Sequence, residues 1–129
     1  MRSAVLMLCV MLVVSVLGGC TRTAETGSPA GEQDSTAAQQ VSVTEGEWYV
    51  RLDPSTVRPG RITFNIRNEG KALHAFELEN GNVEERSADI QPGESTTMTV
   101  TLPAGEYTAY CPIGNHEGRG MHTMLRVEE

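Results

Sequence analysis

The chain has 129 residues, enough for one domain of modest size, and its 17 acidic residues against 10 basic ones give a formal net charge of −7. No cluster of Lys and Arg forms a basic patch, so the sequence argues against nucleic acid as a partner. An acidic surface keeps a small domain soluble or steers it towards basic proteins.

The first 19 residues have the pattern of a secretory signal peptide. Arg2 precedes an apolar stretch over residues 4–17, which is short for a membrane span. The four residues ending at Cys20, Leu-Gly-Gly-Cys, resemble the lipobox of bacterial lipoproteins. That resemblance implies that Cys20 becomes the first mature residue and carries a lipid. An ordinary cleaved signal and an uncleaved anchor are the alternatives. All three place the rest of the chain outside the cytoplasm, in the periplasm or at the cell surface.

Residues 20–40 have the composition of a flexible linker. They are rich in Thr, Ser, Gly, Ala, Gln and acidic residues and contain no large apolar side chain. Such a segment cannot bury enough surface to offset the entropy of its chain. We therefore expect a lipid-anchored, disordered linker over 20–40 and a folded domain over 41–129.

From residue 41 onward, apolar and polar residues alternate with the period of half-buried β-strands. The alternation is clearest over 62–66 and 98–102, and turn sequences containing Pro, Gly and Asn separate the strands. This pattern predicts an all-β domain, either a sandwich or a barrel. Trp48 is in phase with Val50 and Leu52, which predicts that the indole packs in the core.

A run near the carboxyl terminus places a thiol, an imidazole and a thioether at even spacing. Cys111, His116 and Met121 form a Cys-x4-His-x4-Met pattern, and glycines at 114, 118 and 120 provide backbone freedom for a tight loop. A thiolate, two imidazoles and a distant thioether suit copper in both oxidation states, because the site fully grants neither ion's preferred geometry. With His74 as the second imidazole, the sequence predicts a site for one copper ion.

Strand phase supports this choice of ligands. His74 is in phase with Phe76, which predicts an inward-facing imidazole, and Met121 is in phase with Leu125. His122 falls on the opposite face, so its use as a ligand would require the last strand to turn over.

Cysteine usage points the same way. Cys9 would leave with the signal peptide and Cys20 would carry lipid, so Cys111 is the sole thiol of the expected domain and no internal disulfide is possible. An unpaired thiol in an oxidising compartment is reactive unless a metal occupies it, and this favours the copper site.

From about residue 41 to residue 129 the chain resembles the cupredoxin family. The resemblance is carried by Tyr110-Cys111, the Gly-Asn-His at 114–116, the Gly-Met at 120–121, and His74. It implies a Greek-key β-sandwich or barrel with a type 1, or blue, copper ion at one end. The implied function is that of a monomeric electron carrier, and not an enzyme. It would exchange single electrons with redox proteins such as a cytochrome or a membrane oxidase or reductase.

The flanks of the ligands depart from the usual pattern of the family. Ala75 stands where Asn is common, and Pro112 stands where Ser or Thr is common. The resemblance suggests that the backbone N–H groups of Ala75 and Ile113 donate to the Cys111 sulfur. It also suggests that the carbonyl of Leu73 approaches the copper opposite the thioether.

The same residues are compatible with other functions. A lipoprotein that delivers or buffers copper could use the same fold, and a metal-free ligand-binding sandwich would require the four ligands to coincide by accident. Zinc prefers four strong ligands, so a thioether would be a poor fourth. A binuclear copper centre needs a second loop cysteine, which the sequence lacks. No catalytic constellation stands out.

Overall fold

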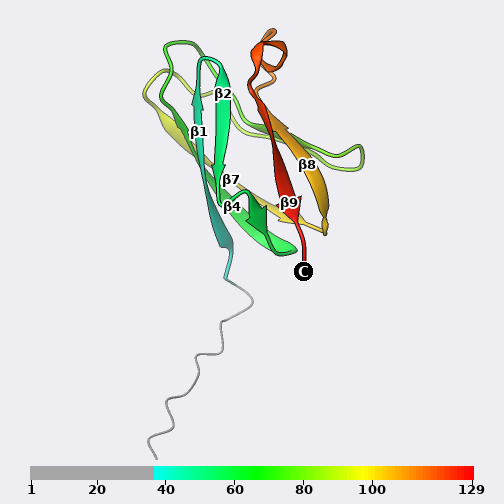
Figure 1. The fold of residues 1–129 in the computed structure, drawn as a ribbon. Helices are drawn as coiled ribbons and strands as arrows, with labels where there is room; N and C mark the ends of the chain where they lie inside the picture. Colours follow the sequence, from blue (N-terminus) through cyan, green and yellow to red (C-terminus); the bar gives the residue numbers. More distant parts are fainter. Residues whose placement is uncertain (1–36) are drawn as a thin grey trace, which may run out of the picture. The chain divides into compact units, whose positions relative to one another are not determined.

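The computed structural model describes residues 37–129, which form two facing β-sheets (Figure 1). The expected signal peptide, the lipidation residue Cys20 and the linker up to residue 36 lie outside these residues. The first strand, β1 (Gln39–Gly46), includes the last two residues of the expected linker, 39 and 40, and both pair with β4 (Gly60–Asn68). Over residues 37–129, the structure contains no helix with the length and apolar character needed to cross a membrane.

One sheet has four strands in the order β2-β1-β4-β7. Its strands are β1 (Gln39–Gly46), β2 (Tyr49–Asp53), β4 (Gly60–Asn68) and β7 (Ser95–Leu102). Strands β1 and β4 run parallel, while the other two pairings are antiparallel.

The second sheet has five strands in the order β3-β9-β8-β5-β6. Its strands are β3 (Thr56–Val57), β5 (Glu77–Glu79), β6 (Glu84–Arg86), β8 (Gly105–Tyr110) and β9 (His122–Val127). Only the β3–β9 pairing is parallel. A single 3-10 turn, η1 (Glu117–Arg119), interrupts the connection from β8 to β9.

The core lies between the sheets and consists of the inward residues of the alternating strands. In β4 and β7, the buried rows predicted over 62–66 and 98–102 are present. Phe64 and Phe76 meet across the core with their ring centroids 5.3 Å apart, within the range of favourable aromatic pairs. The prediction of an all-β sandwich is therefore confirmed.

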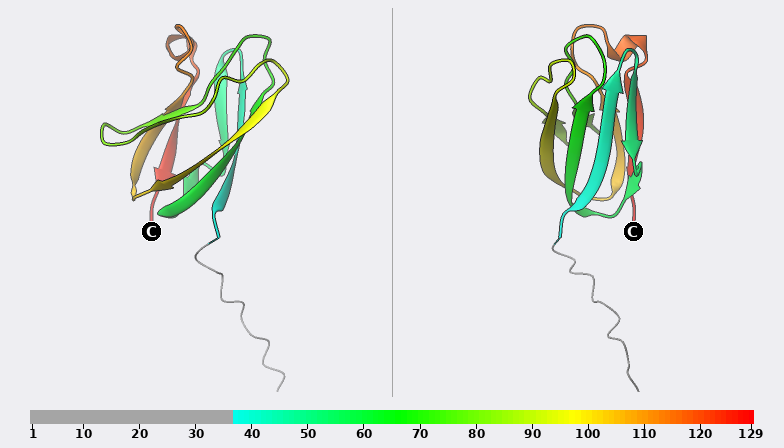
Figure 2. Two further views of the ribbon diagram at one scale, coloured as in Figure 1. Left: turned by 180° about the vertical axis from the view of Figure 1, so that it is seen from behind. Right: turned by 90° about the vertical axis from the view of Figure 1, so that its left-hand side faces the viewer.

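One end of the sandwich gathers the loops that concern function. The turn between β1 and β2 and the β8–β9 connection lie at this end, while the C-terminus lies at the other (Figures 1 and 2). Trp48 occupies that β1–β2 turn and is 37% exposed, so the prediction that it packs in the core is wrong. The strand alternation that placed it inward is interrupted because the chain reverses at Glu47 and Trp48.

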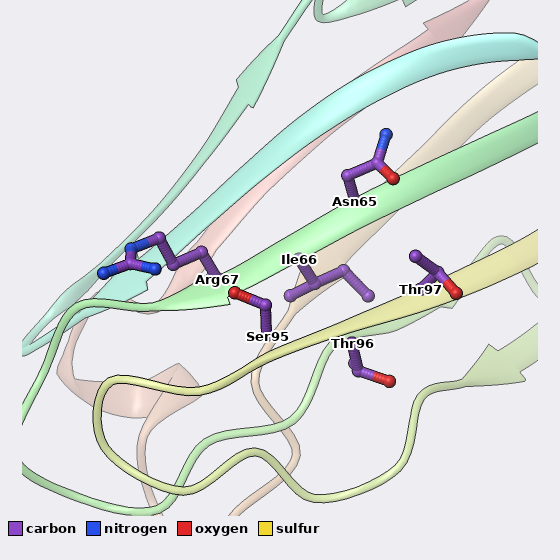
Figure 3. Close-up of a pocket in the computed structure, with 6 residues that line it drawn as sticks. All are labelled: Asn65, Ile66, Arg67, Ser95, Thr96 and Thr97. Carbon is purple, nitrogen blue, oxygen red and sulfur yellow. The ribbon is translucent and has the colours of Figure 1, made fainter.

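An open pocket lies along β4 and β7 (Figure 3), and none of the predicted ligands lines it. It is lined by Asn65, Ile66, Arg67, Ser95, Thr96 and Thr97. These side chains are mostly hydroxyls and amides without a titratable pair or a metal-ligating cluster, so the pocket suggests no chemistry.

Candidate metal centre

His74 lies in the connection from β4 to β5 and is held there by its backbone. Its N–H donates to the carbonyl of Ile90 at 3.2 Å, and the Ile90 N–H donates back at 2.8 Å. The imidazole is fully buried, as its strand phase predicted.

The buried side chain of Asn68 braces the same connection. Its amide nitrogen donates to the carbonyls of Ala72 and Ile90, both at 2.8 Å, and its Oδ1 accepts from the Gly70 N–H at 2.8 Å. Because Asn68 is the last residue of β4, these bonds tie the His74 segment to the sheet.

The other three predicted ligands lie on the β8–β9 connection, and their backbones bond to one another. The Cys111 N–H donates to the carbonyl of Met121 at 3.0 Å, and the Met121 N–H donates to the carbonyl of His116 at 3.1 Å. The loop therefore fixes the spacing of these residues through its main chain.

Two of the three loop glycines have the predicted conformational role. Gly114 and Gly120 have φ angles of 54° and 116°, in the left-handed region that side chains disfavour. Gly118 differs, because it lies against the side chain of Asn115, which would have to move to admit a Cβ atom there.

Three donor atoms converge on one point. The Nδ1 atoms of His74 and His116 are 3.2 Å apart, and the Cys111 Sγ lies 3.7 Å and 3.6 Å from them, respectively. A circle through the three atoms has a radius of about 2.0 Å, close to the 2.0–2.3 Å of metal bonds to imidazole nitrogen and thiolate sulfur. Among residues 37–129, this is the one group of His, Cys and acidic residues arranged to hold a metal ion.

Met121 lies on the inward side, as its strand phase predicted. It is fully buried in the core cluster that also contains Cys111. His122 is exposed, with its Nδ1 3.3 Å from the carbonyl oxygen of Glu117. The structure therefore places His122 outside the donor group, on the face that its strand phase predicted.

Two opposing effects act on the pKa of the Cys111 thiol. Burial is the main cause that raises its pKa, while backbone N–H donors from Ala75 and Ile113 favour the thiolate and lower it. These two donors are the ones that the family resemblance suggested. Since the thiol keeps its proton without a metal, metal binding must release that proton.

Two acidic residues beside the centre escaped the sequence analysis. Glu45 continues the inward row of Val41 and Val43, and neither of its carboxylate oxygens has a hydrogen-bond partner among residues 37–129. Burial raises the pKa of Glu45 to about 8. The sequence carries a signal for this burial, because Glu45 follows Val41 and Val43 at the two-residue spacing of a strand.

Glu47 lies in the β1–β2 turn, so no periodicity marks it. Its carboxylate accepts N–H bonds from Lys71 and Ala72, and these bonds lower its pKa to about 2. Its Oε1 also lies 3.3 Å from Nε2 of His74. Burial is the main cause that lowers the pKa of His74, and it keeps the imidazole neutral and able to bind a metal.

The half-buried His116 connects the centre to the surface. The Trp48 ring contacts its imidazole edge-to-face, with centroids 5.0 Å apart, and the guanidinium of Arg119 lies 4.4 Å from the centroid of Trp48. The carbonyl of Trp48 also lies close to Gly120, where a Cβ atom would be 3.2 Å away. The turn that carries Trp48 therefore covers the ligand loop.

The sequence matches one known family over most of its length. A family model described as a cupredoxin-like domain matches residues 6–123, a span that includes all four predicted ligands. The chain belongs to the cupredoxin-like family. No curated protein matches the sequence.

Solved structures share the cupredoxin-like fold. Reduced auracyanin from Roseiflexus castenholzii superposes with a TM-score of 0.61 at 20% identity, covering 72% of this chain and 99% of that one. Auracyanin A from Chloroflexus aurantiacus, described as a blue copper protein, has a TM-score of 0.60 at 18% identity and covers 71% of this chain and 100% of its own. A copper-containing nitrite reductase from Thermus scotoductus also matches at 16% identity and a TM-score of 0.54, over 70% of this chain and 31% of that chain. At these identities, the likeness establishes the fold alone.

The donor set of this cupredoxin-like domain fits one copper ion. A soft thiolate and two imidazoles, placed in a triangle with a buried thioether in the same core, suit copper in both oxidation states, because they impose a geometry between those that Cu(I) and Cu(II) prefer. A second cysteine is absent from residues 37–129, so the site has a single sulfur of thiolate type.

Proposed function

We propose that this protein is an extracytoplasmic blue copper protein that carries single electrons, with His74, Cys111, His116 and Met121 as the ligands. The observation that supports it most is the convergence of three donor atoms within 3.2–3.7 Å at one end of the sandwich. When bound, copper would supply the chemistry by alternating between Cu(I) and Cu(II).

The residues around the site would limit the structural rearrangement that accompanies each change of oxidation state. Backbone hydrogen bonds from Cys111 to Met121 and from Met121 to His116 hold the loop ligands. Hydrogen bonds from Asn68 and Ile90 hold the segment that carries His74. Because these constraints lie in the backbone and the core, the ligand positions would not depend on the oxidation state. Small rearrangement favours rapid electron exchange.

His116 is the proposed site of electron entry and exit. It is the half-buried member of the donor triangle, while His74 and Cys111 are fully buried. The exposed ring of Trp48 and the partly exposed Pro112 and Ile113 would surround the contact with an apolar surface. A small apolar contact suits redox partners that must dissociate quickly.

The location and partners belong to the same proposal. The signal-like segment and the lipobox-like sequence ending at Cys20 support a membrane-anchored lipoprotein outside the cytoplasm. A monomer tethered in this way would meet redox proteins such as a cytochrome or a membrane oxidase or reductase. Loss of lipid labelling in Cys20→Ala is the expected result, and retained labelling would contradict the anchor.

The absorption spectrum is the direct test of the copper site. The protein loaded with Cu(II) should absorb strongly at about 600 nm, through charge transfer from the Cys111 thiolate to the metal. The Cys111→Ser variant should lose this band, whereas His122→Ala should keep it. A colourless Cu(II) complex, or an unchanged band in Cys111→Ser, would refute the proposed centre.

A kinetic comparison separates the electron carrier from a copper-delivery or copper-buffering protein. The proposal predicts rapid electron exchange between the reduced and oxidised forms, with copper retained when an apo-acceptor is added. Slow electron exchange together with rapid metal transfer would favour delivery. Because His74 is fully buried and backbone hydrogen bonds connect the other three ligands, we expect the protein to retain its copper.

A further inference from the structure

The carboxylate of Glu47 occupies a cradle made by the segment that leads to His74. It accepts hydrogen bonds from the N–H groups of Lys71 and Ala72, at 2.8 Å and 2.7 Å, respectively. Gly70 closes the cradle, since a Cβ atom there would lie 2.5 Å and 2.8 Å from the two carboxylate oxygens and 2.8 Å from Nε2 of His74. Glu47 thus bridges the β1–β2 turn and the His74 segment.

The two nitrogens of His74 face different partners. Its Nδ1 faces Cys111 and His116 inside the donor triangle, while its Nε2 lies 3.3 Å from Oε1 of Glu47. A neutral imidazole carries one proton, and only the unprotonated nitrogen can bind a metal. The proton must therefore be on Nε2 when Nδ1 serves as the ligand, and Nε2 then donates it to Glu47.

We propose that Glu47 is a positioning residue for the copper site, because its carboxylate accepts the Nε2 proton of His74 and so keeps Nδ1 free for the metal. This proposal rests on the role of His74 as a ligand in the proposed function. Carboxylate partners of ligating histidines fix the tautomer and the ring orientation and make the ligand more basic. A ligand made more electron-rich by a negative charge stabilises Cu(II) more than Cu(I), so Glu47 lowers the reduction potential.

Of Glu47 and Glu69, two acidic residues near His74, Glu47 is the one that contacts the imidazole ring. Glu69 belongs to the same connection, but its carboxylate pairs with Arg67 at 3.6 Å and is half exposed. Among residues 37–129, Glu47 is the one acidic residue whose side chain contacts a nitrogen of His74. Glu69 therefore provides a matched control that removes the same charge without removing the contact.

Two variants separate the contact from the charge. Glu47→Gln keeps the side-chain shape and removes the charge. Gly70→Ala keeps the charge, and its backbone does not require glycine by conformation, but its methyl group would press on both the Glu47 carboxylate and Nε2 of His74 and so disturb the contact between them. The control is Glu69→Gln.

We expect Glu47→Gln and Gly70→Ala to lower Cu(II) affinity by about 10- to 100-fold relative to the control, which is the usual effect of losing such a partner. With Cu(I) affinity unchanged, each tenfold loss would raise the reduction potential by about 59 mV. Equal Cu(II) affinities and potentials in Glu47→Gln and Glu69→Gln would overturn the proposal.

Nitrogen NMR of His74 in the copper-free protein tests the same idea without electron transfer. The full-length protein and Glu69→Gln should show the Nε2–H tautomer at neutral pH, and Glu47→Gln should show a mixture of tautomers. An unchanged tautomer in Glu47→Gln would contradict the proposal. Failure of the blue spectrum in the unmodified protein would instead refute the proposed function, while the tautomer would still report on Glu47.

Discussion

The buried carboxyl of Glu45 should make the stability of the metal-free protein depend on pH. Its side chain is fully buried on the inward row of β1, and its oxygens have no hydrogen-bond partner among residues 37–129. Removing a carboxylate from water without pairing it favours the neutral acid. Glu45→Gln substitutes a neutral group of nearly the same shape, so it removes the titration and preserves the packing.

The size of the effect follows from the pKa. The pKa of Glu45 rises from 4.5 in an exposed chain to about 8 in the fold, and each pKa unit is worth about 1.4 kcal/mol. The folded protein holds the proton in this interval and the unfolded chain does not, so folding stability decreases as pH rises. Compared with its value below pH 4.5, the free energy of unfolding is lowered by Glu45 by about 3 kcal/mol at pH 7 and by about 5 kcal/mol above pH 8.

The assay is urea denaturation of the metal-free protein at intervals from pH 5 to pH 9. The quantity to plot is the difference in unfolding free energy between Glu45→Gln and the unmodified protein. Taking the difference cancels other titrations, such as that of His74, whose lowered pKa reduces stability as pH falls below 6.5. The exposed Glu84→Gln, in β6, is the control and should show no such trend.

We expect the two proteins to have similar stability near pH 5 and the variant to be more stable by several kcal/mol near pH 8. A constant difference across this range would refute the reasoning. It would mean that Glu45 is ionised in the fold, and therefore that the carboxylate has a partner or access to water.

Three further predictions concern the centre and its support. Asn68→Ala should cost about 2–4 kcal/mol in urea denaturation, because it leaves buried backbone groups without partners, whereas the exposed Asn65→Ala should cost under about 1 kcal/mol. Equal losses would argue against the brace. Gly120→Ala should cost about 1–3 kcal/mol through its φ of 116°, and unchanged stability would indicate that the loop relaxes. Copper affinity should rise by about tenfold per pH unit between pH 6 and pH 8, since binding displaces the Cys111 proton; a pH-independent competition titration would contradict this.

The strand framework could be predicted from the sequence because β-strands have a strict two-residue period. The alternating apolar residues over Ile62–Ile66, for example, identify the buried face of their strand without any tertiary information. The same rule gave the inward orientation of His74 and the outward orientation of His122. It failed at Trp48, because a turn interrupts the period and sends the next side chain to the surface.

The sequence by itself determined the fold class, the copper-type donor set, and the order and spacing of the loop ligands, since these depend on local periodicity and on residue chemistry. Only the tertiary structure decided which groups surround those ligands. The contact of Glu47 with His74 joins residues 27 positions apart, and Trp48 meets His116 through another turn-to-loop contact. Such contacts depend on how two sheets pack and where their connecting turns meet, and no local pattern in the chain encodes that geometry.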